Sequence, residues 1–122
     1  MTTKVLVIDD SQMVRLQVGR ALSGAGFVII EAVDGADAIE KLQASPDTSL
    51  IVCDVNMPRM NGLDFLEKKN ALGNTVPVVM LTTEGQPELI KKAKMLGAKG
   101  WVMKPFKADS LVAAAKKLTA IA

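Results

Sequence analysis

The chain has 122 residues, 49% of them hydrophobic and 23% charged, so it is long enough to bury one core and too apolar to be disordered. Fifteen basic and 13 acidic residues give a net charge of +2, and only 3% of the residues are aromatic, which argues against a nucleic-acid-binding protein. No apolar run approaches the roughly 20 residues of a membrane span, and the first strand begins too early to leave room for a signal peptide. We therefore expect one cytoplasmic domain, residues 1–122, that binds neither nucleic acid nor a membrane.

A short apolar run followed by a helical pattern recurs five times along the chain. The predicted strands cover about residues 4–9, 27–32, 49–54, 76–82 and 100–104, and the predicted helices about 11–24, 35–45, 61–72, 86–97 and 107–121. Each predicted helix carries an apolar stripe at helical spacing, which indicates one face buried against a sheet. The stripes are formed by Val14, Val18, Ala21 and Leu22; Ala38, Ile39 and Leu42; Leu63, Leu66 and Leu72; Leu89, Ala93 and Leu96; and Leu111, Ala115 and Leu118.

Glycines and short polar residues mark the limits of these helices. Gly26, Gly73 and Gly97 stand where helices are expected to end. Asp34-Gly35 and Asn61-Gly62 mark the turns that begin the next helices.

Alternation of strands and helices predicts an α/β fold with right-handed crossovers and helices on both faces of a parallel sheet. For five strands the natural order is 2-1-3-4-5, a flavodoxin-like three-layer (βα)5 sandwich. The first and third strands are then neighbours, and a ligand crevice opens at their carboxyl ends.

Polar side chains stand where four of the apolar runs end. Asp9 and Asp10 follow the first run and Asp54 follows the third. Thr82 ends the fourth run, and Lys104 follows the fifth. If these strands are parallel, three carboxylates, a hydroxyl and an ammonium meet at one edge of the sheet, in the crevice.

The residue types that the chain lacks narrow the chemistry of this edge. There is no histidine and only one cysteine, Cys53, which lies inside an apolar run and is expected to pack inertly. Carboxylates, hydroxyls and lysine remain, so a bound metal is expected to be hard, such as Mg²⁺, rather than zinc. The seven methionines are expected mostly to pack in the core or to anchor loops; Met95 and Met103 could instead contact a partner, although packing is the favoured interpretation.

Four sequence segments, in order and at strand ends, resemble the receiver domain of bacterial two-component response regulators, specifically the stand-alone CheY-like (chemotaxis) type. The segments are Val7–Ser11, Asp54–Gly62, Leu81–Glu84 and Gly97–Phe106. The resemblance covers the whole chain. CheY is itself a standard example of the 2-1-3-4-5 strand order, so that order also belongs to the resemblance.

The resemblance implies the roles of the polar residues. Asp54 would accept a phosphoryl group from a histidine kinase. Asp9, Asp10 and Asp54 would hold Mg²⁺ together with the main-chain carbonyl of Asn56. Thr82 would donate a hydrogen bond to a phosphoryl oxygen, and Lys104 would pair with its charge. Taken alone, Asp9-Asp10 could equally be a helix N-cap pair.

The family also implies a switch. Thr82 would move inward on phosphorylation, and the aromatic of the fifth strand, here Trp101 instead of Tyr or Phe, would follow it. Trp101 could also be an ordinary, partly buried packing residue. Thr83 stands where a small residue is usual and would narrow access to the phosphoryl group. Asn56 and Glu84 would tune the phosphoryl lifetime, unless they are ordinary polar loop residues. The family keeps the bond between Lys104 and Pro105 cis, and we predict the same here.

The resemblance predicts a monomeric signalling protein rather than a turnover enzyme, with only self-phosphorylation from small phosphodonors and autodephosphorylation as intrinsic chemistry. The upstream partner would be a CheA-like histidine kinase. A flagellar motor switch or another effector would bind downstream, through the fourth helix, fifth strand and fifth helix. Seven lysines make these helices basic, as a solvated face or as a docking surface for an acidic partner: Lys91, Lys92, Lys94, Lys99, Lys107, Lys116 and Lys117.

Other functions compatible with this fold are less well supported. The closest is a phosphorelay carrier that passes its phosphoryl group to a histidine phosphotransfer domain. A receiver of a larger transcription regulator would need a DNA-binding module, and none is expected after the fifth helix. A magnesium-dependent phosphatase would need an acid two residues after Asp54, where Asn56 stands. Flavin binding would need a loop rich in Ser, Thr and Gly in place of Asp9–Met13.

Overall fold

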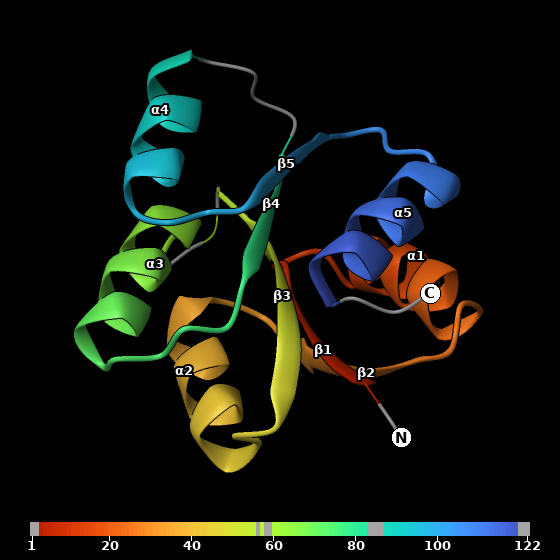
Figure 1. Ribbon diagram of the computed structural model, residues 1–122, viewed down its shortest axis with the longest axis horizontal. Coiled ribbons are helices and arrows are strands. Elements are labelled where there is room, and N and C mark those ends of the chain that lie inside the picture. Colours follow the sequence, from red (N-terminus) through yellow and green to blue (C-terminus); the bar gives the residue numbers. More distant parts are fainter. Residues whose placement is uncertain (1–2, 56, 58–59, 83–86, 120–122) are drawn as a thin grey trace.

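The computed structural model of the protein describes residues 3–55, 57, 60–82 and 87–119. The predicted site residues Asn56, Thr83 and Glu84 lie outside them. Strands and helices alternate throughout (Figure 1). The strands are β1 (Thr3–Ile8), β2 (Phe27–Ala32), β3 (Thr48–Asp54), β4 (Val78–Thr82) and β5 (Gly100–Met103), and the helices are α1 (Gln12–Ser23), α2 (Gly35–Ala44), α3 (Gly62–Ala71), α4 (Pro87–Met95) and α5 (Ala108–Thr119).

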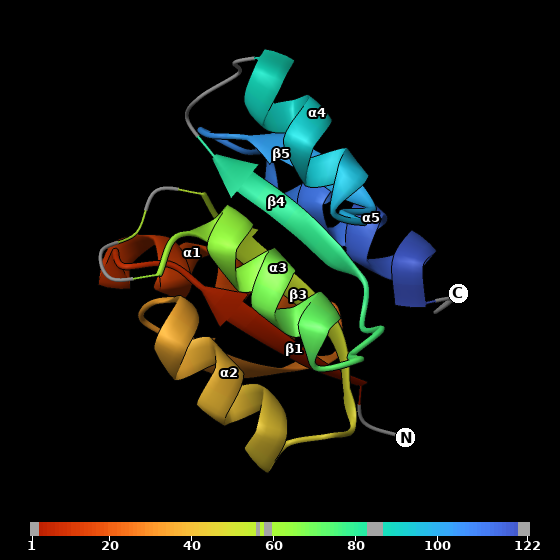
Figure 2. The ribbon, with the colours of Figure 1, turned by 90° about the vertical axis from the view of Figure 1, so that its left-hand side faces the viewer.

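The five strands form one parallel sheet in the order β2-β1-β3-β4-β5, as predicted. In Figure 2 the arrowheads of β1 and β4 point to the same edge of the molecule. The central strands are almost continuously buried, which is why they read as unbroken apolar runs.

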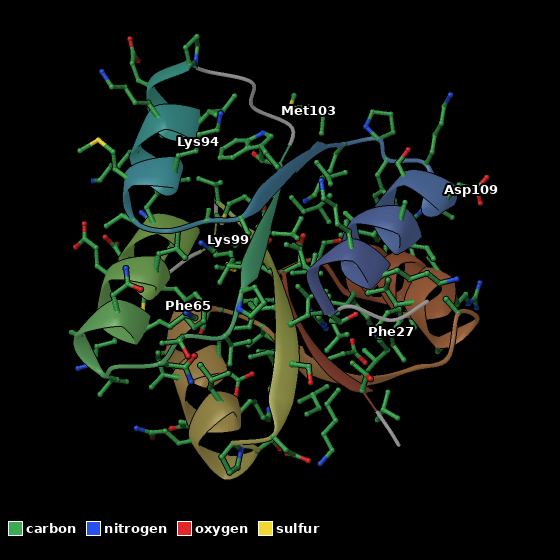
Figure 3. The ribbon with its side chains drawn as sticks, viewed as in Figure 1. Phe27, Phe65, Lys94, Lys99, Met103 and Asp109 are labelled. Atoms are coloured by element: carbon green, nitrogen blue, oxygen red, sulfur yellow. The ribbon has the colours of Figure 1, made fainter. Side chains whose placement is uncertain are left out.

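Helices cover both faces of the sheet and enclose two separate apolar cores. One core lies between the sheet and α2, α3 and α4, and the other lies between the sheet and α1 and α5. Figure 3 shows Phe65 and Phe27, one residue from each core, on opposite sides of the sheet. The three-layer α/β sandwich predicted from the sequence is therefore confirmed.

Local sequence signals explain where the helices begin and end. Asp34 and Asn61 cap α2 and α3, because each side chain accepts a hydrogen bond from the backbone N–H three residues on. Gly26, Gly73 and Gly97 follow helices and have positive φ angles of 99°, 76° and 95°, a conformation that favours glycine.

Three residues of the sequence prediction are misplaced, and one buried residue was missed. Leu72 does not join the apolar stripe of α3, because the helix ends at Ala71 and leaves Leu72 48% exposed. Phe65, which the stripe omitted, is completely buried. Met95 and Met103 are 79% and 43% exposed, so they do not pack in the core.

Candidate functional site

Asp9 lies at the carboxyl end of β1, and hydrogen bonds fix both its side-chain oxygens and its backbone N–H. Its side chain is 2% exposed, Oδ1 accepts a hydrogen bond from the Ser11 N–H (2.9 Å), and Oδ2 accepts one from Lys104 Nζ (2.9 Å). Its backbone N–H donates to the Ala32 carbonyl across the β1–β2 pair (3.2 Å). Asp10, the next residue, is exposed.

Ser11, not Asp9 or Asp10, is the N-cap of α1. Its hydroxyl accepts a hydrogen bond from the Val14 N–H at 3.3 Å. The interpretation of Asp9-Asp10 as merely a capping pair is therefore wrong, because the Ser11 hydroxyl accepts the hydrogen bond from the first turn of α1 that a capping side chain accepts.

Asp54 ends β3 and is 6% exposed. Its Oδ1 accepts a hydrogen bond from the Val55 N–H (2.9 Å) and lies 3.5 Å from Lys104 Nζ. The Cys53 thiol donates to the Asp54 carbonyl at 3.2 Å, and Gly62 N–H donates to the Val55 carbonyl at 2.9 Å. The first residue of α3 thus packs directly on the end of β3.

Lys104 links the acids to the ends of the last two strands. Its ammonium group stands between Asp9 and Asp54, and its backbone N–H donates to the Thr82 carbonyl at 2.8 Å. Thr82 is completely buried at the end of β4. The bond between Lys104 and Pro105 is cis, as predicted.

The electrostatic environment raises the pKa of Asp54 to about 6. Burial is the largest cause and the neighbouring charge of Asp9 is the next, while Lys104 and the Val55 N–H partly offset them. Burial, followed by the charges of Asp54 and Asp9, raises the pKa of the Cys53 thiol well above its usual range. Cys53 is thus an inert packing residue, as predicted.

The carboxylates have the spacing of a site for a hard cation. Asp9, Asp10 and Asp54 each present one oxygen, and these three oxygens all lie within 4.8 Å of one another. Oxygen ligands in a Mg²⁺ octahedron lie at about 2.1 Å from the ion, and thus roughly 3 to 4 Å apart. Two of the acids are buried and Asp10 is exposed, so the cluster opens to solvent on one side, where Mg²⁺ held by these carboxylates would keep some of its water ligands.

Trp101 lies on β5, two residues before the end of that strand. In the sheet register Trp101 is opposite Met80, and Met103 is opposite Thr82. Trp101 is partly buried against the core under α4, and its indole N–H donates to the sulfur of Met103 at 3.4 Å. Of the predicted site residues, the structure therefore brings together Asp9, Asp10, Asp54, Thr82 and Lys104. Trp101 is connected to them through its neighbour Met103, which is opposite Thr82 in the register.

Sequence reasoning missed two constraints on the site. Gly62 was recognised only as a turn residue, although no side chain fits between it and the Asp54 carbonyl. Arg15, which donates to the Asp9 carbonyl, was not singled out, because no sequence signal marks a single arginine in a helix.

The sequence profile described as "Response regulator receiver domain" matches residues 5–116. The chain belongs to this family. A chemotaxis protein CheY of Treponema pallidum is 42% identical to the receiver domain over 105 residues, which cover 84% of this chain and 73% of that protein. The chemotaxis protein CheY of Bacillus subtilis is 34% identical over 119 residues, which cover 96% of this chain and 98% of that protein.

Solved structures show the same fold. The receiver domain superposes on CheY4 of Vibrio cholerae with a TM-score of 0.90 and 36% identity, covering 97% of this chain and 99% of that one. It also superposes, with a TM-score of 0.90 and 27% identity, on one chain of a CheX–CheY–BeF3–Mg complex of Borrelia burgdorferi, covering 95% of this chain and 88% of that one. Among the described residues, no helix of the receiver domain is long and apolar enough to cross a membrane.

Proposed function

We propose that this receiver domain is the phosphoacceptor signalling protein of a two-component system in chemotaxis, phosphorylated on Asp54 by a CheA-like histidine kinase. One observation carries the proposal: a buried Asp54 shares its site with Asp9, Asp10 and the ammonium group of Lys104. The similarity to the chemotaxis proteins CheY of Treponema pallidum, CheY1 of Helicobacter pylori and CheY of Bacillus subtilis supports the pathway.

The carboxylates of Asp9, Asp10 and Asp54 would hold Mg²⁺, with the main-chain carbonyl of Asn56 as a further ligand. When bound, this ion supplies positive charge between two anionic reactants. Three acids and one lysine leave the site with excess negative charge, which favours a divalent cation and disfavours an approaching phosphoryl group.

The protein's own groups position and neutralise the reactants. A carboxylate oxygen of Asp54 attacks phosphorus, a P–O bond forms, and the P–N bond to the donor histidine breaks. Lys104, already shared by Asp9 and Asp54, is close enough to pair with the new phosphoryl oxygens. Thr82 would donate its hydroxyl to one of them. We expect no multiple-turnover catalysis of a separate substrate. Self-phosphorylation from small donors and autodephosphorylation are the only intrinsic reactions expected of the site.

Phosphorylation would be transmitted through Thr82 and Trp101. The β4–β5 register places Met103, the acceptor of the Trp101 indole N–H, directly opposite Thr82. A shift of Thr82 toward the phosphoryl group would thus act on the neighbours of Trp101. Asn56, Thr83 and Glu84 are proposed to set access to the phosphoryl group and its lifetime.

The effector, such as a flagellar motor switch, would bind to α4, β5 and α5. Exposed Met95 and exposed lysines on α4, including Lys91 and Lys94, make this face apolar and basic. It therefore suits an acidic segment with apolar anchors. We propose that the protein acts as a monomer in the cytoplasm. The phosphorelay alternative is not favoured, because relatives that are 34% to 42% identical are chemotaxis proteins.

Labelling with radioactive acetyl phosphate in the presence of Mg²⁺ tests the proposal. We expect incorporation into the unaltered protein, none into Asp54→Asn, and normal incorporation into Asp109→Asn, which removes an exposed acid from α5 (Figure 3). Equal labelling of Asp54→Asn would refute the assignment of the phosphoacceptor.

A further inference from the structure

Arg15 bridges three elements at the edge of the acidic cluster. It belongs to α1, its Nη1 donates to the Asp9 carbonyl at the end of β1 (2.7 Å), and its Nε donates to Glu31 Oε1 on β2 (2.9 Å). The Arg15 side chain is 12% exposed, whereas that of Glu31 is 48% exposed. A guanidinium group suits such a bridge because its donors are held in one rigid plane.

The Asp9 carbonyl belongs to the peptide that joins Asp9 to Asp10. A peptide unit is planar, so a hydrogen bond to its oxygen fixes the orientation of the whole unit and the direction in which Asp10 leaves it. The Asp9 side chain is already held by Ser11 and Lys104. Asp10, by contrast, is exposed, so burial does not restrain it.

We infer that Arg15 is a positioning residue for the divalent-cation site, acting through the Asp9 carbonyl on the placement of Asp10, with Glu31 holding the guanidinium group in place. This inference rests on the proposed function only in taking the cation to bind at Asp9, Asp10 and Asp54. Groups that orient metal ligands typically contribute about 10- to 100-fold to metal affinity.

The charge of Arg15 and its positioning role predict opposite results. A cation close to the cluster repels Mg²⁺, so removing the charge of Arg15 alone would strengthen Mg²⁺ binding. If Arg15 acts by positioning, its removal loosens Asp10 and weakens Mg²⁺ binding instead. The sign of the change therefore separates the two roles.

The test is calorimetric titration of Mg²⁺ into the unaltered protein and into Arg15→Met, which keeps an apolar stem but no donor. We expect the dissociation constant to rise about tenfold in Arg15→Met. Arg15→Lys, which keeps the charge but lacks the rigid fork, should also bind more weakly, whereas a role of charge alone predicts unchanged binding. Arg20→Met removes an exposed arginine of the same helix and should leave the dissociation constant within about twofold, because it lies five residues, roughly 7.5 Å, further along α1.

A double variant and a spectroscopic readout sharpen the test. Glu31→Met should weaken Mg²⁺ binding, and combining it with Arg15→Met should add nothing, because both act through one carbonyl. The amide resonance of Asp10 should shift in Arg15→Met and stay in place in Arg20→Met. If Arg15→Met does not fold, Arg15→Lys and Glu31→Met decide the matter. Mg²⁺ binding that is unchanged or tighter in the folded Arg15 variants would overturn the inference. Absence of Mg²⁺ binding to the unaltered protein would instead refute the proposed function.

Discussion

Gly62 stands against the backbone carbonyl of Asp54, so closely that a methyl group on Gly62 would collide with it. The same Gly62 donates its N–H to the Val55 carbonyl at 2.9 Å. The start of α3 therefore fixes the end of β3, and with it the acid that we propose to be phosphorylated.

We predict that Gly62→Ala lowers the free energy of unfolding by about 1–3 kcal/mol, since the neighbouring atom is backbone and cannot move aside. It should also weaken Mg²⁺ binding. Gly19→Ala is the control: it lies inside α1, where a methyl group would meet only Ile29 at 3.8 Å, so it should stabilise the fold by about 0.5–1 kcal/mol. Urea denaturation measures both. If Gly62→Ala proved as stable as the unaltered protein, the close packing at Asp54 would be disproved.

The pKa of Asp54, raised to about 6 from the ordinary 3.8, predicts how stability changes with pH in metal-free protein. The folded state binds the proton more tightly than the unfolded state, so this group contributes stability below about pH 4 that is lost as the pH rises through about 6. The loss is on the order of 3 kcal/mol for this group alone. Carboxyls with lowered pKa values, such as Asp37, act in the opposite direction.

The difference between the unaltered protein and Asp54→Asn isolates the contribution of Asp54. We expect the variant to gain stability relative to the unaltered protein between pH 4 and pH 7, as followed by urea denaturation in EDTA. A constant difference across this range would contradict a raised pKa. Adding Mg²⁺ should abolish most of the difference, because the bound ion favours the charged carboxylate.

Lys104 neutralises two acids, so its removal should act in opposite directions on stability and on metal binding. Lys104→Met should destabilise metal-free protein at pH 8 by about 2 kcal/mol, because Asp9 and Asp54 then repel each other without compensation. The same variant should bind Mg²⁺ more tightly, since a competing cation is gone. Lys107→Met, an exposed lysine on the same segment, is the control and should change neither quantity appreciably. Weaker Mg²⁺ binding in Lys104→Met would show that Lys104 has a different role.

The contact between Trp101 and Met103 provides a reporter for the switch. Trp101 is the single tryptophan, and its indole N–H donates to the Met103 sulfur next to Thr82 in the sheet register. We expect its fluorescence to change on addition of Mg²⁺ and beryllofluoride, and the change to be reduced in Thr82→Val. Met103→Leu should alter the starting fluorescence, because it removes the acceptor. An unchanged spectrum in all these conditions would mean that Trp101 is only a packing residue.

Much of the fold was predictable because buried parallel strands read as unbroken apolar runs and the polar residues stand where those runs end. Asp9, Asp54 and Lys104 could be brought together from topology alone. The end of α3 was placed one residue too late because apolar Leu72 was counted in the stripe, although six residues separate it from Leu66, which puts it on another face of the helix. Gly73 already marks the end of the helix. A single isolated side chain such as Met103 gives no periodic signal that distinguishes a core residue from an exposed one.

Constraints set by backbone contacts could not be predicted. The contact of Gly62 with the Asp54 carbonyl depends on how closely α3 approaches β3. The bridge made by Arg15 depends on the relative placement of α1, β1 and β2. Both depend on three-dimensional packing that the order of residues does not display.

The most direct test of the account is to locate the phosphoryl group. The protein is treated with acetyl phosphate and Mg²⁺, the acyl phosphate is reduced with borohydride, and mass spectrometry of the peptides identifies the reduced aspartate. We predict reduction at position 54 alone, abolished when EDTA replaces Mg²⁺. Reduction at Asp9 or Asp10 instead, or at position 54 regardless of Mg²⁺, would contradict the central claim.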